Sequence, residues 1–227
     1  MDISKRNKLN IESRWRKIQN KEKRYIERNA ERYPYLKARI FGYLAGDGNI
    51  YEGKTKTNRH NSARFFPDHP SLLKPFCNAF KLVYRKRPLV YKKTNFYCVT
   101  VDSKIIIQDI IIQARFGVKR WRVPFNLLID DFAKKEWLRA FFDCEAYICK
   151  NHIKIQTINK QGMLEIKSLL EEFGVQSNYH TYTPKNERWY VNHILFIFKE
   201  GRQKYLETIG FNHALKQDML KNQKPFK

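Results

Sequence analysis

The chain lacks the long apolar segments that membrane and secreted proteins carry. Its longest apolar run, residues 105–112, is interrupted by Gln108 and Asp109. A membrane-spanning helix needs ~20 apolar residues. The opening MDISKRNKLN has no apolar core of the kind found in signal peptides. The sequence therefore predicts no membrane partner and a place in the cytoplasm or nucleoplasm, with access to genomic DNA.

Cysteine is scarce, and its spacing excludes the common cysteine-based sites. The four residues Cys77, Cys98, Cys144 and Cys149 contain no C-x2-C pair, and the closest two are five positions apart. This spacing suits neither a zinc ribbon nor a redox motif. We expect reduced, mostly buried thiols.

Acidic residues are few beside the basic ones. The chain has 45 Lys and Arg against 22 Asp and Glu, a formal charge of +23 and a pI of about 9.9. Because hydrophobic residues make up 42% and aromatic residues 15%, the composition is that of a folded protein. The charge excess favours a polyanionic partner, with nucleic acid first and an anionic membrane surface second.

Both ends of the chain carry an excess of basic residues. Residues 1–35 form a charged extension, in which Ile11, Trp15, Ile18 and Ile26 could share one weak helical stripe. The alternatives are a helix, a solvated arm, or an arm that lies along DNA phosphates. The tail 216–227 could also touch phosphate or be frayed.

Between these ends the sequence repeats itself. The runs LKARIFGYLAGDGNIY (36–51) and KKEWLRAFFDCEAYIC (134–149) are both apolar and helix-like. Each ends in a small residue, an acid and another small residue, and the acids Asp47 and Glu145 are 98 positions apart (145 − 47). The repeat predicts a first half at 36–118, a linker at 119–132 and a second half at 133–227.

The elements expected after each run occur in the same order. The first half offers a strand at 63–66, a helix at 71–84, strands at 89–91 and 96–101, and a helix at 103–114. The second half offers a strand at 152–158, a helix at 162–173, strands at 177–183 and 189–198, and a helix at 201–209. Lys104 and Arg202 each follow their acid by 57 positions (104 − 47 and 202 − 145).

The two acids are more informative as a pair than singly. Alone, each could be a solvated turn residue at a helix end, with Gly48 in a left-handed cap. However, Gly42 and Gly46 share one helix face, and Ala140 and Cys144 share another, so small residues permit close packing. That packing would place two carboxylates beside two negative helix ends. Hard divalent cations bind such oxygen-rich sites and promote phosphodiester hydrolysis.

The segments FGYLAGDGNI and WLRAFFDCEAYI resemble the two copies of the motif that defines LAGLIDADG homing endonucleases. The resemblance extends over residues 36–210. It implies an α+β fold of two pseudo-symmetric αββαββα halves, with saddle-like antiparallel sheets and the motif helices packed at the interface. It further implies that Asp47 and Glu145 bind metal and that each sheet enters the major groove of DNA.

The resemblance also implies an activity and its cofactor. Members of this family make a staggered double-strand break in a long DNA target by metal-dependent hydrolysis. They use Mg²⁺, although Mn²⁺ or Ca²⁺ can occupy the same site, and the carbonyls of Gly46 and Cys144 would join the two acids as ligands. A chain that opens on Met1 resembles an intron-encoded, monomeric member, for which intron RNA is a further partner.

The second motif departs from the family pattern. Glu145 stands where Asp is usual and Ala146 where Gly is usual, so the two metal positions are expected to be unequal. The first motif has Ala45 where the second retains an acid, Asp143, and we expect Asp143 to be a structural cap.

Members of the family place a basic residue near each scissile phosphate. The symmetry of the repeat makes Lys104 and Arg202 the candidates for this role, with Lys150 as a nearby alternative. The competing interpretation is that each is an ordinary basic residue on the surface. DNA contacts are expected from polar side chains on the strands and loops. They are Lys54, Lys56, Arg59, His60, Arg85, Arg87, Lys92, Lys93 and Asn95 in the first half, and Asn151, Lys154, Gln156, His180, Lys185, Asn186 and Arg188 in the second.

Three functions remain in competition. The first is a site-specific DNA endonuclease, which the paired acids favour. The second is a non-cleaving protein on the same fold, either an RNA-splicing maturase or a nucleic-acid-binding regulator. The third is a basic structural partner of RNA, which would not depend on Asp47 or Glu145.

Overall fold

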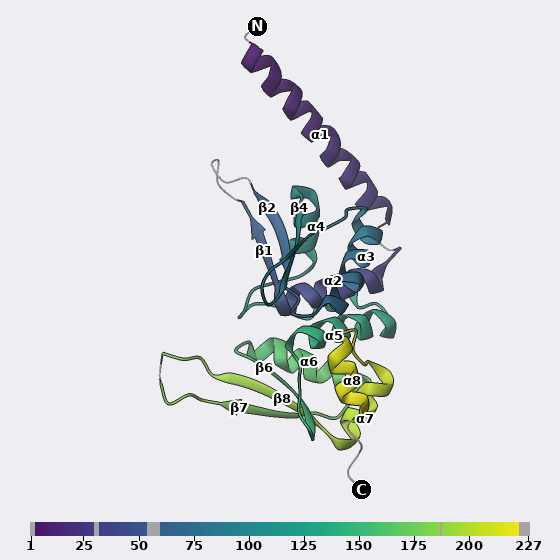
Figure 1. The fold of residues 1–227 in the computed structure, drawn as a ribbon, viewed down its shortest axis with the longest axis vertical. Coiled ribbons are helices and arrows are strands. Elements are labelled where there is room, and N and C mark those ends of the chain that lie inside the picture. Colours follow the sequence, from purple (N-terminus) through teal and green to yellow (C-terminus); the bar gives the residue numbers. More distant parts are fainter. Residues whose placement is uncertain (1–2, 30–31, 54–59, 187, 223–227) are drawn as a thin grey trace.

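The chain folds into two halves of the same topology. The structure is a computed structural model that describes residues 3–29, 32–53, 60–186 and 188–222. Each half contains a four-stranded antiparallel sheet, with the order β1-β2-β4-β3 in the first and β5-β6-β8-β7 in the second. The predicted α+β architecture of two pseudo-symmetric halves is thus confirmed (Figure 1).

The first half runs helix, two strands, helix, two strands, helix, after a long N-terminal helix. Its elements are α1 (Ile3–Asn29), α2 (Pro34–Asp47), β1 (Gly48–Glu52), β2 (Asn61–Phe65), the 3-10 helix η1 (Pro70–Leu72), α3 (Leu73–Tyr84), β3 (Leu89–Lys92), β4 (Tyr97–Asp102) and α4 (Lys104–Gln113).

The second half repeats this order and adds one helix. Its elements are the 3-10 helix η2 (Phe125–Leu127), α5 (Asp131–Glu145), β5 (Tyr147–Ile148), β6 (His152–Thr157), α6 (Lys160–Glu172), β7 (Asn178–Tyr182), β8 (Asn192–Phe198), α7 (Lys199–Thr208) and α8 (Ala214–Asn222). Side-chain caps start several of these helices: Asp130 Oδ1 accepts from Ala133 N at 2.7 Å, which fixes the start of α5.

Alternation along the strands gives each sheet one buried and one open face. In β6 the side chains of Ile153 and Ile155 are buried, whereas Gln156 is exposed. Helix α4 packs against the first sheet, and α6 and α7 pack against the second. One polar face of each sheet therefore stays open to solvent.

Helices α2 and α5 form the junction between the halves. They make the most extensive contact between any two elements in the described part of the chain. Phe41 and Trp137 are fully buried there, and one hydrophobic core runs through both halves. An ion pair of 2.6 Å between Arg39 and the buried Glu136 also crosses this junction.

The structure corrects several expected boundaries. Strands β1 and β5 follow directly on the motif helices and were not separated from the motif runs by sequence. Gly48 is not a left-handed cap, because its φ of −104° and ψ of 157° are extended and begin β1. Its lack of a side chain matters for another reason: an added Cβ would lie 2.4 Å from the Leu44 backbone. Helix α7 begins at Lys199, before the predicted start at 201.

The N-terminal extension is a helix over 27 residues, which resolves the alternatives of helix and irregular arm. Tyr25 Oη donates to the carbonyl of Leu82 at 2.9 Å, and Glu22 accepts from Lys86 and from Ser103. These contacts anchor its C-terminal part, while its N-terminal part projects from the body (Figure 1). No helix among the described residues combines the length and apolar character that crossing a bilayer requires.

Candidate metal centre and nucleic-acid interface

Small residues bring the backbones of α2 and α5 into contact. A Cβ added at Gly42 would lie 2.5 Å from the carbonyl oxygen of Trp137 and 2.8 Å from Ala140 Cβ. A Cβ added at Gly46 would lie 2.5 Å from Cys144 Cβ. Since real atoms do not approach this closely, the helix pair depends on glycine at both positions. The approach at Gly46 brings the C-terminal ends of the two helices together.

Asp47 and Glu145 are the last residues of these helices and are both half-buried. Burial, and then the negative charge of Asp47, raises the pKa of Glu145 to about 7. Burial also raises the pKa of Asp47, against the opposing effects of a hydrogen bond with Cys144 and the charge of Lys216. Each carboxylate thus lies beside the other and beside the negative end of a helix. This pocket has an excess of negative charge that a cation would offset.

The donor set suits a hard divalent cation. Two carboxylates and the carbonyls of Gly46 and Cys144 are oxygen ligands of the kind that Mg²⁺ and Ca²⁺ prefer. A positive group already contacts this end of α5: Lys216 Nζ donates to the carbonyls of Asp143 at 2.6 Å and Cys144 at 3.1 Å. In the described part of the chain, no three His, Cys, Asp or Glu side chains gather as a metal cluster. The remaining ligands would have to be water and the oxygens of a bound phosphate.

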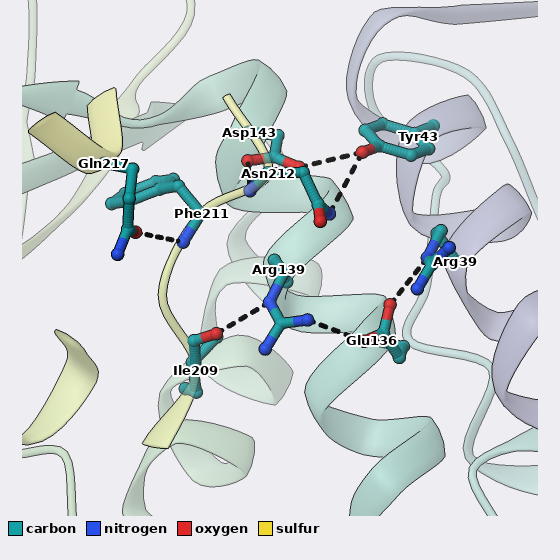
Figure 2. A network of polar contacts seen from close by, with 9 residues as sticks. All are labelled: Arg39, Tyr43, Glu136, Arg139, Asp143, Ile209, Phe211, Asn212 and Gln217. Atoms are coloured by element: carbon teal, nitrogen blue, oxygen red, sulfur yellow. Dashed lines mark hydrogen bonds and ion pairs between the residues drawn. The ribbon is translucent and has the colours of Figure 1, made fainter. Parts of the chain in front are cut away.

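Asp143 secures the geometry behind this pocket. Its Oδ2 accepts from Tyr43 Oη at 2.9 Å, and its Oδ1 accepts from the backbone N–H groups of Asn212 and His213 at 2.8 and 2.9 Å. Figure 2 shows this carboxylate between α2 and the segment that precedes α8. Burial raises the pKa of Asp143, and the hydrogen bonds oppose that rise. Its contacts are those of the structural cap expected from the sequence.

A second polar network lies further along the same junction. Glu136 accepts from Arg39 Nε at 2.6 Å and from Arg139 Nη1 at 2.7 Å. Arg139 Nε in turn donates to the carbonyl of Ile209 at 2.7 Å (Figure 2). A buried carboxylate with two guanidinium partners fixes the register of α5 against α2 and against the end of α7.

Sequence reasoning missed the site role of helix α8. The repeat could not reveal Lys216, because a shift of 98 positions places it opposite Val118, the last residue of the first half, beyond the helix expected at 103–114 (216 − 98). His213 Nε2 lies 3.4 Å from Asp68 Oδ1, and the His213 ring stacks on His69 with centroids 4.7 Å apart. The charge of Asp68 also acts on Asp47. Lys216, His213 and Asp68 belong to no recognisable sequence motif. Only the tertiary fold brings them close to Asp47 and Glu145.

The predicted basic residues occupy helix starts beside the sheets. Lys104 is exposed at the first residue of α4. Arg202 lies in the first turn of α7, where its Nη1 donates to the carbonyl of Lys150 at 2.9 Å. The structure therefore joins two of the second-half candidates, Arg202 and Lys150. Both halves present a base in the first turn of the helix that follows their fourth strand.

The first sheet presents part of the expected DNA-contacting set. Lys54, Lys56 and Arg59 lie outside the described residues. His60 is exposed, with Nε2 3.3 Å from Asp102 Oδ1. It lines a hollow of about 420 Å³ on the open face together with residues that the sequence did not nominate, which are Asn49, Tyr51 and Arg64. Because side chains alternate along a strand, all three point to the solvent-exposed face of the first sheet.

Around β3 the predicted residues divide into two groups. Arg85 is not on the sheet: it ends α3, and its guanidinium lies 6.0 Å from the centre of the Tyr25 ring of α1. Beside the strands, the exposed side chains are those of Arg87, Lys92, Lys93 and Asn95. This edge of the first sheet is strongly basic.

The second sheet carries its predicted residues on the open face and at the tips. Lys154 and Gln156 share the outward face of β6, as alternation predicts, and His180 is exposed on β7. Asn151 is exposed in the β5–β6 turn, and the exposed side chains of the β7–β8 loop include Lys185, Asn186 and Arg188. The same face carries Phe196, which is paired with Lys154 in the register. Polar and aromatic groups are thus mixed on this sheet.

The cysteines take no part in a disulfide or cluster among the described residues. Cys77, Cys98, Cys144 and Cys149 are all free thiols, as predicted. All four are half-buried, which is more exposed than expected.

Comparisons with known proteins agree with this arrangement. The LAGLIDADG-like domain matches residues 133–210. The homing endonuclease I-DmoI in complex with DNA and Mn superposes with a TM-score of 0.63 and 17% identity, over 78% of this chain and 96% of that chain. Full-length DUF199/WhiA from Thermatoga maritima superposes with a TM-score of 0.54 and 12% identity, over 92% of this chain and 67% of that chain.

Curated relatives match by sequence as parts of much longer proteins. The replication factor C small subunit of Methanocaldococcus jannaschii is 25% identical over 221 residues, which are 92% of this chain and 12% of the relative. The isomerizing glutamine–fructose-6-phosphate aminotransferase of the same organism is 28% identical over 189 residues, 80% of this chain and 17% of the relative. The chain thus spans less than a fifth of either. Residues 133–210 match a LAGLIDADG-like domain, and 78% of the chain shares the two-half fold of the homing endonuclease I-DmoI.

Proposed function

We propose that the chain is a metal-dependent, site-specific DNA endonuclease that makes a staggered double-strand break in a long target. The observation that carries this proposal is the pair of half-buried carboxylates, Asp47 and Glu145, at the joined C-terminal ends of α2 and α5. A protein that only binds nucleic acid gains nothing from two carboxylates placed where phosphate would approach.

Asp47 and Glu145, with the carbonyls of Gly46 and Cys144, would hold divalent cations, Mg²⁺ in the first place. Such cations activate water and stabilise charge on the transferring phosphate. In the reaction the water oxygen bonds to phosphorus, one P–O bond to the sugar breaks, and the departing oxygen takes a proton. Arg202, Lys150 and Lys104 would attract and orient the phosphates.

The open faces of the two sheets would carry the target. Their polar side chains suit base edges in the major groove, and the exposed lysines and arginines suit phosphates. A net charge of +23 favours a duplex partner over any neutral ligand. The chain brings both acids to the site itself, which supports action as a monomer.

A non-cleaving nucleic-acid binder is the second candidate. The likeness to WhiA keeps it open, because that superposition covers 92% of this chain and the fold is therefore not confined to I-DmoI. An RNA-splicing maturase belongs to the same alternative. Both predict tight binding that is indifferent to neutralisation of Asp47 and Glu145.

The test is cleavage of a randomised duplex library with Mg²⁺ by the wild type, Asp47→Asn and Glu145→Gln. We expect a unique site to be cut, and each substitution to abolish cutting while duplex binding in Ca²⁺ survives. Asp131→Asn, at the other end of α5 and 85% exposed, is the matched control and should cut normally. Tight binding without cutting in Mg²⁺ or Mn²⁺ would overturn the nuclease proposal and favour the binder.

A further inference from the structure

Helix α8 begins directly behind the two acids and is fixed to both halves of the molecule. Ala214 N donates to Ser71 Oγ at 3.1 Å, which ties the helix start to η1 in the first half. His213 N donates to Asp143 Oδ1 at 2.9 Å, which ties it to α5 in the second half. The base from which Lys216 extends is therefore fixed by backbone contacts on either side.

From this base the side chain of Lys216 reaches the end of α5. Its ammonium donates to the carbonyls of Asp143 and Cys144, at 2.6 and 3.1 Å. These carbonyls belong to the last turn of the helix, where no backbone N–H within the helix satisfies them. The side chain is half-buried, so its charge is only partly screened by water.

The same ammonium acts on both acids. Its charge lowers the pKa of Asp47 and of Glu145, against the larger effect of burial on each. The charge of Lys216 also acts on Asp68, so three carboxylates share one lysine. Lys216 has no counterpart in the first half, because the described residues of that half contain no helix equivalent to α8.

The carbonyl oxygen of Cys144 has two roles in this arrangement. The Cys144 carbonyl is a ligand of the proposed metal centre, and it is also a hydrogen-bond acceptor for Lys216. We infer that Lys216 is a resident cation of the acid pair, which holds the end of α5 in the metal-free protein and competes with divalent cations for that site. The inference rests on the proposed metal site and concerns the affinity of that site for a divalent cation.

The inference predicts that removing the ammonium makes the site easier to fill. Lys216→Met keeps an unbranched side chain of similar length but deletes the charge and the donors. We expect the full-length variant without DNA to bind Mn²⁺ on the order of tenfold more tightly than the wild type, which corresponds to about 1.4 kcal/mol. Calorimetric titration with Mn²⁺ measures this directly and requires no cleavage.

Lys221→Met provides the matched control. Lys221 is exposed on the same helix, so its removal changes the net charge equally but leaves the carbonyl contacts in place. We expect its Mn²⁺ affinity to stay within about twofold of the wild type, since exposed charges are well screened. Equal affinities for the two variants, or weaker Mn²⁺ binding by Lys216→Met, would overturn the inference.

Thermal unfolding gives a second measurement, which remains informative if Lys216→Met is less stable than the wild type. In EDTA, Lys216→Met should melt below the wild type, and saturating Mn²⁺ should narrow that gap. A gap that stays constant would contradict competition. Lys216→Gln, which keeps a donor but not the charge, should fall between the two in Mn²⁺ affinity.

Failure of the inference can be told from failure of the proposed function. If Asp47→Asn and Glu145→Gln leave Mn²⁺ binding unchanged, the metal site itself is wrong. If both abolish binding while Lys216→Met behaves like Lys221→Met, only the role of Lys216 is wrong.

Discussion

The two halves share a topology but differ in what surrounds their motif helices. The first motif ends in Asp47 and passes straight into β1 through Gly48, which lies against the Leu44 backbone. The second ends in Glu145, whose pKa is raised to about 7, and its end is covered by the ammonium of Lys216. The pseudo-symmetry therefore fixes where the acids lie, and elements outside the repeat set the environment of each.

The buried carboxylate that caps the α2–α5 junction is also present in only one of the two motifs. Asp143 collects hydrogen bonds from Tyr43, Asn212 and His213, whereas the equivalent position in the first half is Ala45 (143 − 98). A single buried carboxylate thus ties the first half, the second half and the α8 segment together. The experiments below compare matched positions, beginning with this one.

Asp143→Ala should have the largest effect on stability. It leaves Tyr43 Oη and two backbone N–H groups without their acceptor in a buried site, which costs about 3 kcal/mol or more. Urea unfolding followed by circular dichroism measures the loss. Asp218→Ala, which is exposed on α8, should change the free energy of unfolding by less than about 0.5 kcal/mol. Similar losses for the two would show that Asp143 does not join the halves.

Exchanging the lengths of the two acids should cost about a hundredfold in cleavage rate. Asp47→Glu and Glu145→Asp each move a carboxylate by roughly one methylene, and misplacement near 1 Å costs about 10²-fold. The double exchange should not restore the rate, because the two acids have different neighbours. Single-turnover cleavage of the cognate duplex is the measurement. Recovery of wild-type rate by the double variant would mean that the two metal positions are interchangeable.

Gly42→Ala should destabilise the junction by about 2 kcal/mol, as overpacking does. The added Cβ would meet the carbonyl of Trp137 at 2.5 Å, and backbone cannot move aside as a flexible side chain can. The exchange variant Gly42→Ala with Ala140→Gly removes the Ala140 Cβ but leaves that carbonyl. We therefore expect it to remain destabilised in urea unfolding. Full recovery would show that the two small residues form a symmetric pair.

The sequence was most informative where the repeat and local chemistry agree. The apolar runs, the small residues at positions 42, 46, 140 and 144, and the spacing of the acids predicted the paired motif helices, while the family resemblance implied the two antiparallel sheets. Strands β1 and β5 were merged with the motif runs. Gly48 was expected to be a helix cap, but Gly48 and Ala146 both have extended backbone where the strands begin.

The sequence could not predict contacts that only long-range packing creates. Lys216 belongs to a lysine-rich tail that resembles many solvated tails, and nothing in its spacing links it to position 144. Arg85 resembled a strand-end base, but Tyr25 of α1 lies beside it. The stripe at Ile11, Trp15, Ile18 and Ile26 left a helix and an irregular arm as alternatives. The structure has a helix, which Glu22 and Tyr25 anchor by hydrogen bonds.

Helix α1 offers the last comparison, since the second half has no such element in its described residues. Residues 3–29 contain ten Lys and Arg against three acids, a net charge of +7 (10 − 3). Three of the bases, Arg14, Arg16 and Lys17, are exposed on its projecting part. If this helix lies along DNA phosphates, its charges add affinity without reading sequence.

Neutralising Arg14, Arg16 and Lys17 with Gln should then weaken duplex binding by about tenfold and reduce the salt dependence of the affinity, since each lost phosphate contact lowers the slope by about 0.9. Fluorescence anisotropy at several salt concentrations measures both. The control replaces Lys199, Lys204 and Lys221, which are exposed on α7 and α8, with Gln. An equal loss in both triple variants would mean that α1 contributes only to the overall charge. A larger loss from α1, at an unchanged cleavage position, would make it a phosphate-binding arm particular to the first half.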